Sequence, residues 1–227
     1  MKLRLYLMFA FAISVICVIG FAVVSMLISD HQIAGFDKTI IASVQGLESP
    51  GLTKVMKFFT FIGSTKFVII LSIIIILFLY LALKHRLEVI LFTIVVIGTG
   101  IINQLLKQFF HRIRPDFHRL IEIGGYSFPS GHAMSAFSVY VMLTFLLWRH
   151  IPAKIWRTVL ILFSIVMILM IGISRIYLGV HYPSDIIGGY LASGVWVSFA
   201  IFFFQYYKEK RYNRKYKPAE DNRENLQ

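Results

Sequence analysis

Six apolar stretches, separated by short polar segments, dominate the chain. A helix needs about 20 apolar residues to cross the hydrocarbon core of a bilayer, and each stretch is at or near that length. The stretches occupy residues 5–28, 67–83, 87–106, 133–148, 158–173 and 186–204. We therefore predict an all-α polytopic membrane protein with six transmembrane helices in one bundle.

The composition agrees with a membrane-embedded chain. Of the 227 residues, 58% are hydrophobic and 15% are charged, whereas soluble domains carry roughly 25% charged residues. The mean hydropathy is +0.75. The first stretch is longer than the apolar core of a signal peptide, about 7 to 15 residues, and no small-residue cleavage site follows it, so it is retained as a span. Because the loops are too short to fold alone, residues 1–207 are predicted to form one membrane domain.

Two segments outside the spans have a distinct composition. Residues 52–62 interleave aromatic residues with Lys54 and Lys57 and are too short to span. They predict a short amphipathic helix in the outer interface, with an ordinary loop as the alternative. Residues 208–227 are basic and then mixed polar. They predict a cytoplasmic tail that anchors at anionic lipid and is disordered beyond Lys217.

The distribution of Lys and Arg predicts the orientation of the bundle. Six crossings place both termini on one side, and cytoplasmic flanks hold the excess of cations. With the termini inside, 14 of the 23 cations are cytoplasmic. The nine outer cations are Lys38, Lys54, Lys57, Lys66, Lys107, Arg112, Arg114, Arg119 and Arg175. Because the cations flank apolar stretches, the net charge of +12 favours anionic lipid over nucleic acid as a partner.

Three polar motifs lie at the predicted outer ends of the spans, where ionisable groups usually serve a function. The first is Lys107-x6-Arg114-Pro115. If the third helix continues past the membrane edge, Lys107, His111 and Arg114 share one face at i, i+4 and i+7. Snorkelling of long cationic side chains at a helix end is the alternative interpretation.

The second motif, Pro129-Ser130-Gly131-His132, directly precedes the fourth apolar stretch. Ser130 can cap that helix, whose free N–H groups bind anions, and Gly131 lets an anion approach the backbone closely. Near a phosphate, His132 would retain its proton and could transfer it to a departing oxygen. The alternative is a simple helix start.

The third motif is Ser174-Arg175-x5-His181-x3-Asp185. Pro183 suits the first turn of the sixth helix and places Asp185 in that turn, so His181 and Asp185 can face each other. A carboxylate bonded to one ring nitrogen fixes the tautomer and leaves the other nitrogen free as a nucleophile. A structural ion pair at the helix start is the alternative.

Together the three motifs resemble the signature of the type 2 phosphatidic acid phosphatase family of membrane lipid phosphatases. All three parts occur without substitution between Lys107 and Asp185. The resemblance implies that His181 attacks phosphorus to form a phosphohistidine, that Asp185 orients it, and that His132 protonates the leaving lipid oxygen. The implied phosphate-binding residues are Lys107, Arg114, Ser130, Gly131 and Arg175. His111, His118 and Asp116 lie outside the signature and can at most support the site.

The resemblance also implies a metal-independent lipid phosphatase, with no cofactor, acting at the outer face of a bacterial plasma membrane. Family members without a large extra domain resemble phosphatidylglycerophosphate phosphatases and undecaprenyl pyrophosphate phosphatases; we favour the former, with the latter or broad specificity as alternatives. The expected partners are the lipid phosphate substrate and membrane lipids, with no nucleic acid and no obligate protein partner. A transporter would show broken helices in repeated halves, which the sequence lacks. A noncatalytic lipid-binding protein would not need the pairing of His181 with Asp185.

Overall fold

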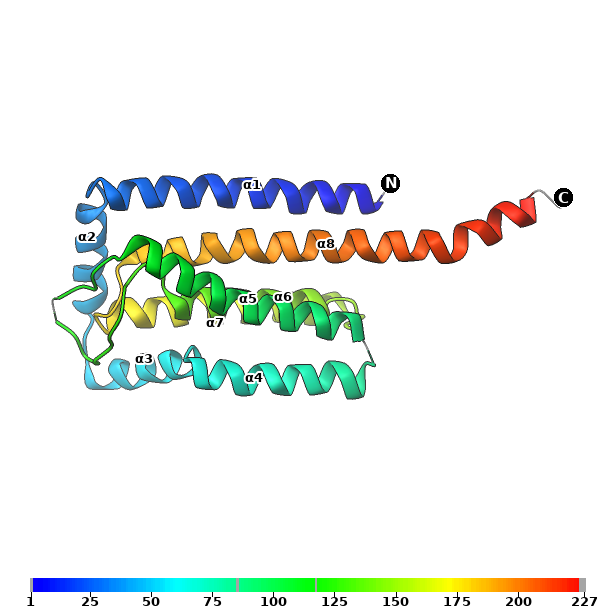
Figure 1. The fold of residues 1–227 in the computed structure, drawn as a ribbon. Coiled ribbons are helices and arrows are strands. Elements are labelled where there is room, and N and C mark those ends of the chain that lie inside the picture. Colours follow the sequence, from blue (N-terminus) through cyan, green and yellow to red (C-terminus); the bar gives the residue numbers. More distant parts are fainter. Residues whose placement is uncertain (1, 85, 117, 225–227) are drawn as a thin grey trace.

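A computed structural model describes residues 2–84, 86–116 and 118–224, and within these residues the regular structure is entirely helical. In chain order the helices are α1 (Lys2–Ser29), α2 (Ala34–Gln45), α3 (Pro50–Ile62), α4 (Thr65–Leu77), the π-helical segment η1 (Phe78–Ala82), α5 (Arg86–Phe110), α6 (Gly131–Leu147), α7 (Lys154–Tyr177) and α8 (Pro183–Glu224). The long helices run alongside one another, while α2 lies across them at one end (Figure 1). The predicted all-α membrane fold is confirmed.

In the part of the chain that the structure describes, five helical segments are long and apolar enough to cross a membrane. They are Met8–Ser29, Thr65–Ala82, Arg86–Phe110, Lys154–Tyr177 and Pro183–Arg211. The remaining stretch, the fourth along the chain, forms α6, which is 17 residues long and packs against α5, α7 and α8. A central helix surrounded by others is shielded from lipid along much of its length. The count of six crossings stays a prediction.

The main apolar core lies between α4, α5, α6 and α8. Phe92 and Val95 of α5, Met142 of α6 and Val197 of α8 belong to one buried cluster. Elsewhere small residues let helices approach closely, as transmembrane packing favours. A Cβ added to Gly194 of α8, for example, would lie 2.6 Å from a sulfur atom of α1. Large apolar side chains on the outward faces remain exposed, as expected of surfaces that contact lipid.

The end of the bundle that carries α2 and the long loop between α5 and α6 lies opposite the two chain termini (Figure 1). Residues 52–62, predicted as a short amphipathic helix, are helical within α3. Ser49 caps α3, accepting a hydrogen bond from the Leu52 amide, and Pro50 occupies its first turn. Helix α2 was not predicted, because its 12 residues mix polar and apolar types and its N-cap, Ile33, provides no side-chain hydrogen bond.

Helix α8 extends into the predicted C-terminal tail. α8 continues through the basic residues to Glu224, where disorder was predicted beyond Lys217. Residues 225–227 of the predicted tail lie outside the described residues. The division into a membrane domain and a tail at residue 208 stays a prediction.

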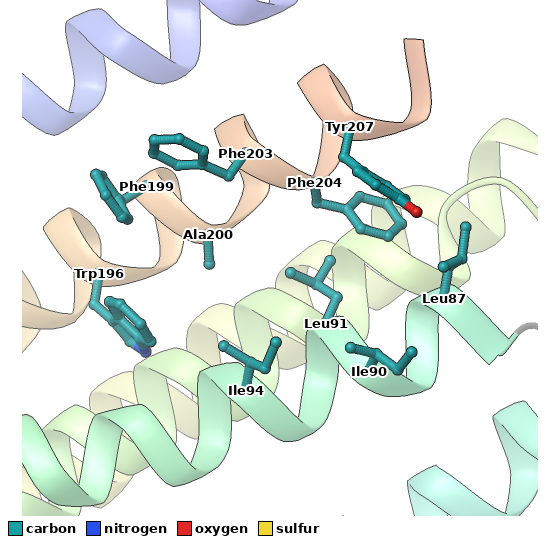
Figure 2. Close-up of a pocket in the computed structure, with 10 residues that line it drawn as sticks. All are labelled: Leu87, Ile90, Leu91, Ile94, Trp196, Phe199, Ala200, Phe203, Phe204 and Tyr207. Carbon is teal, nitrogen blue, oxygen red and sulfur yellow. The ribbon is translucent and has the colours of Figure 1, made fainter. Parts of the chain in front are cut away.

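An apolar groove of about 450 Å³ lies between α5 and α8 (Figure 2). Its walls include Ile90 and Ile94 of α5 and Trp196, Phe199 and Phe203 of α8. The groove borders the N-terminal half of α5, whereas Lys107 lies in the last turn of that helix. Because its lining is almost wholly apolar, the groove offers no groups for phosphate chemistry.

Candidate active site

The loop between α7 and α8 carries a histidine that faces a carboxylate in the first turn of α8. His181 lies in this loop and Asp185 in the first turn of α8. His181 Nδ1 lies 3.2 Å from Asp185 Oδ2, and the two side chains are 2% and 0% exposed. The loop requires Gly179, whose φ is +72°; a Cβ there would lie 2.2 Å from the His118 carbonyl oxygen. The local backbone therefore fixes the position of the pair.

Hydrogen bonds identify which nitrogen of His181 carries the proton. Asp185 Oδ2 faces Nδ1 and also accepts hydrogen bonds from the Tyr182 amide at 2.8 Å and from the Ser127 hydroxyl. The other ring nitrogen, Nε2, lies 3.1 Å from Arg114 Nη1. A guanidinium can only donate, so Nε2 accepts and the proton is assigned to Nδ1. This tautomer gives Nε2 the lone pair that a nucleophile needs.

Burial sets the charge of His181. Removal from water lowers the pKa of His181 to about 3, outweighing the opposing effect of Asp185, and the nearby Arg175 and Arg114 lower it further. The imidazole is therefore neutral at physiological pH. A neutral ring is the protonation state that a nucleophilic nitrogen requires.

The segment after α5 places a buried guanidinium beside this histidine. Arg114 donates hydrogen bonds from Nη1 to the Val180 carbonyl at 2.8 Å and from Nη2 to the Tyr126 carbonyl at 3.1 Å. Lys107, in the last turn of α5, donates to the same Tyr126 carbonyl. The two cations of the first motif therefore meet at one carbonyl oxygen, next to His181.

The route that brings these cations together differs from the sequence expectation. α5 ends at Phe110 and His111 leaves helical geometry with a φ of +48°. Lys107, His111 and Arg114 therefore do not share one helix face, and that expectation was wrong. Pro115 disfavours helical geometry at the residue before it, so a loop delivers Arg114 to the site.

Arg175 supplies a third cation from the last turn of α7 and is 1% exposed. Its Nη1 donates a hydrogen bond to Thr60 Oγ1 of α3 at 3.1 Å. Its Nε and Nη2 find no acceptor in the described parts of the chain. Buried donors are normally satisfied, so these two indicate a place for an anionic ligand. A phosphoryl group fits their forked geometry.

The turn before α6 supplies the second histidine. Ser130 caps α6, and its amide donates a hydrogen bond to the Asp185 carbonyl oxygen at 3.1 Å, which ties this turn to α8. Gly131 and His132 are the first residues of α6, where free N–H groups favour an anion. His132 lies close enough to Arg175 for the charge of the guanidinium to act on it.

The structure thus brings together the residues that the sequence singled out. They are Lys107, Arg114, Ser130, Gly131, His132, Arg175, His181 and Asp185. Their catalytic and phosphate-binding roles stay predictions. Within the described residues, no three His, Cys, Asp or Glu side chains cluster as metal ligands do.

Sequence reasoning missed two charged residues at this site. Arg112 donates to Asp185 Oδ1 at 2.7 Å, and Asp37 of α2 accepts from Arg112 at 2.9 Å. A signal for Asp37 was present, since it is a single carboxylate among apolar residues at helical spacing, such as Ile33 and Ile41. Nothing in the sequence indicated that Asp37 and Arg112 would be neighbours.

The side chains of the three residues outside the signature are exposed, unlike those of His181 and Asp185. His111 is exposed, and His118, whose side chain is 61% exposed, pairs with Glu48 at 2.8 Å. Asp116 is 95% exposed and lies 3.5 Å from Arg119. A supporting role for these residues stays a prediction.

Comparisons with known proteins find similar sequences and a similar solved structure. The family model described as PAP2 superfamily matches residues 87–210. The chain is 33% identical over 200 residues to phosphatidylglycerophosphatase B of Bacillus subtilis (strain 168), which covers 86% of this chain and 95% of that protein. The crystal structure of a transmembrane PAP2-type phosphatidylglycerolphosphate phosphatase from Bacillus subtilis matches with a TM-score of 0.78 at 29% identity, covering 87% of this chain and 96% of that one. An undecaprenyl-diphosphatase of Sulfolobus acidocaldarius is 38% identical over 76 residues, which is 33% of this chain and 31% of that protein.

Proposed function

The chain belongs to the PAP2 superfamily, and from that premise we propose that it is a membrane lipid phosphatase that converts phosphatidylglycerophosphate to phosphatidylglycerol. The observation that carries the proposal is the environment of His181, whose Nδ1 faces Asp185 and whose Nε2 faces Arg114. A neutral histidine with an unprotonated Nε2, next to three cations, is suited to attack a phosphate ester. The match along 95% of the Bacillus subtilis enzyme supports the substrate.

The proposed reaction proceeds in two displacements. His181 Nε2 attacks phosphorus, the bond from phosphorus to the lipid oxygen breaks, and that oxygen takes a proton from His132. Asp185 stabilises the cationic ring of the phosphohistidine through Nδ1. Water, deprotonated by His132, then attacks phosphorus, inorganic phosphate leaves, and Nε2 regains its lone pair. Lys107, Arg114 and Arg175 hold the phosphoryl oxygens and stabilise their developing charge.

The orientation is part of the proposal. The active site faces the outer side of the plasma membrane and both termini face the cytoplasm. Two observations support it: 14 of the 23 cations lie in the inner flanks, and the termini lie at the end of the bundle opposite α2 and the loop that carries Arg114 (Figure 1).

Turnover of defined lipids by purified protein in detergent, with a chelator present, tests the function. We expect phosphate release from phosphatidylglycerophosphate to be faster than from phosphatidate or undecaprenyl pyrophosphate. A preference for undecaprenyl pyrophosphate would instead favour the reaction named for the Sulfolobus relative. Comparable rates on all three lipids would indicate a general lipid phosphate phosphatase, and no release from any of them would overturn the proposal.

The nucleophile is tested by His181→Ala. We expect this variant to release no phosphate above background while its helical circular dichroism and elution volume remain those of the wild type. His150→Ala is the matched control, because His150 lies at the opposite end of the bundle, where it lines a pocket together with Glu88 and Arg149. Full activity of His181→Ala would show that another group attacks phosphorus.

A further inference from the structure

A chain of buried charges connects α2 to the catalytic pair. Arg112 Nη2 donates to Asp37 Oδ2 at 2.9 Å, and Arg112 Nη1 donates to Asp185 Oδ1 at 2.7 Å. Ser184 completes the connection, because its amide donates to Asp37 Oδ1 at 2.9 Å and its hydroxyl to Asp37 Oδ2 at 2.7 Å. One arginine therefore bridges two carboxylates that come from different helices.

The bridge is buried and its geometry is fixed. The side chains of Asp37, Arg112 and Asp185 are 1%, 15% and 0% exposed. The guanidinium also lies 4.1 Å from the centre of the Tyr182 ring, which restricts its rotation. Two buried carboxylates with no cation between them would repel each other strongly, so each depends on Arg112.

Arg112 differs from the cations assigned to phosphate. Both of its terminal nitrogens are already engaged by Asp37 and Asp185, whereas Arg175 keeps Nε and Nη2 without an acceptor among the described residues. The terminal nitrogens of Arg112 are therefore directed at the two carboxylates. Its contact with Asp185 Oδ1 instead fixes the carboxylate so that Oδ2 faces His181.

We propose that Asp37 and Arg112 are positioning residues for the nucleophile, acting in series through Asp185. This inference rests on the proposed phosphatase function. Arg112 sets the angle of the Asp185 carboxylate. Asp37 holds Arg112 and the first turn of α8, and its negative charge offsets that of the guanidinium. Asp185 thereby keeps a negative field at His181 Nδ1, where positive charge develops as Nε2 attacks phosphorus.

The substitution Asp37→Asn tests the proposal with little change of shape. It retains one oxygen that can accept from the Ser184 amide and removes the charge that holds Arg112. We expect the maximal single-turnover rate constant, measured with enzyme in excess over phosphatidylglycerophosphate, to fall roughly 10- to 100-fold, as for other residues that orient a catalytic group. The inhibition constant of inorganic phosphate should change less than about threefold, because the phosphate-binding cations are untouched.

This readout separates positioning from folding. A smaller folded fraction would raise the enzyme concentration needed for saturation and leave the maximal rate constant unchanged. Asp30→Asn is the matched control, since the same change falls on an exposed carboxylate directly after α1, and we expect wild-type rates from it. An Asp37→Asn variant with the wild-type rate constant would overturn the proposal.

Arg112→Lys is a second variant that does not depend on the folding of the first. The lysine ammonium carries the same charge, but it lacks the two coplanar terminal nitrogens with which arginine binds two carboxylates at once. We therefore expect the single-turnover rate constant to fall at least as much as in Asp37→Asn. The double variant should be no slower than Arg112→Lys alone, because the two residues act in series. Multiplicative losses, or full activity of Arg112→Lys, would overturn the proposal. Failure of the wild type to hydrolyse any lipid phosphate would instead refute the proposed function.

Discussion

In the proposed reaction His181 attacks phosphorus in its neutral form, so its pKa decides where acid stops the attack. A histidine with the ordinary value would become protonated as the pH falls through about 6.5. Burial lowers the pKa of His181 to about 3, so the neutral ring persists at every pH above about 4. We expect any acid limb of kcat/KM above that pH to come from another group, such as the substrate phosphate, whose second pKa is about 6.

Nitrogen NMR of histidine-labelled protein in detergent checks this prediction directly. The His181 signals, identified by their loss in His181→Asn, should keep the shifts of a neutral ring from about pH 8 to about pH 4.5. The exposed His118 provides an internal comparison in the same spectrum. Conversion of His181 to the imidazolium form with a midpoint near the ordinary value of about 6.5 would contradict the prediction.

Arg175 supports a second prediction at the scale of single residues. Replacement by Lys keeps the charge but removes the forked donors Nε and Nη2, which have no acceptor in the described chain. Hydrogen bonds to charged groups contribute roughly 1.5–3 kcal/mol each, so we expect kcat/KM to fall about a hundredfold or more. Arg119→Lys in the loop after α5 is the matched control and should remain near wild type. Equal activities of the two variants would show that only the charge of Arg175 matters.

The sequence predicted one part of the site well, and the reason is local. Each motif residue lies at the end of an apolar stretch. An ionisable group is costly to bury there, so it is easily recognised in the sequence as a candidate functional residue. Asp37 and Arg112 escaped notice because their partners are distant in the chain. The contact of Asp37 with Ser184, for example, spans 147 positions. A single sequence carries no signal for that pairing, since only the folded bundle brings α2 against α8.

At the scale of whole elements, α3 is more than an amphipathic segment, because its last turn reaches the active site. Thr60 Oγ1 accepts a hydrogen bond from Arg175 and lies 2.9 Å from Ser174 Oγ. We expect Thr60→Val to lower kcat/KM roughly three- to tenfold, the effect of one lost hydrogen bond. Thr53→Val is the control in the same helix, because its hydroxyl bonds Tyr177 at 2.8 Å, about two turns from Thr60. Equal losses from both variants would indicate that α3 acts only as a support.

The helices themselves were predictable where apolar stretches are long, and their ends were not. The end of α5 at Phe110 depends on the turn at His111, which has a positive φ. After that turn, Arg114 donates a hydrogen bond to the carbonyl of Tyr126. This tertiary contact cannot be predicted from helical periodicity. The short helix α2 was missed for a related reason. Its N-cap forms no side-chain hydrogen bond, so its position depends on packing and on the ion pair of Asp37.

At the scale of the whole molecule, the charges at the site bear on how the bundle is oriented. Among the nine outer cations, Lys107, Arg114 and Arg175 belong to the motifs, which leaves six against 14. The structure engages Arg112 as well, since it bridges Asp37 and Asp185. The cations that remain to oppose the positive-inside rule are Lys38, Lys54, Lys57, Lys66 and Arg119. The asymmetry that supports the proposed orientation is therefore stronger than a plain count suggests.

This asymmetry predicts that a reagent confined to the outside of the cell reaches the active-site end and not the C-terminal end. We expect a membrane-impermeant maleimide to label Asp116→Cys on intact cells and to label Lys210→Cys only after the membrane is opened. Both positions are exposed. Both variants are made with Cys17→Ala, because Cys17 packs against Gly194 and a smaller side chain fits there. Wild-type turnover of each variant would show that the labelled protein is folded. Labelling of Lys210→Cys from outside would invert the orientation and place the phosphate chemistry in the cytoplasm.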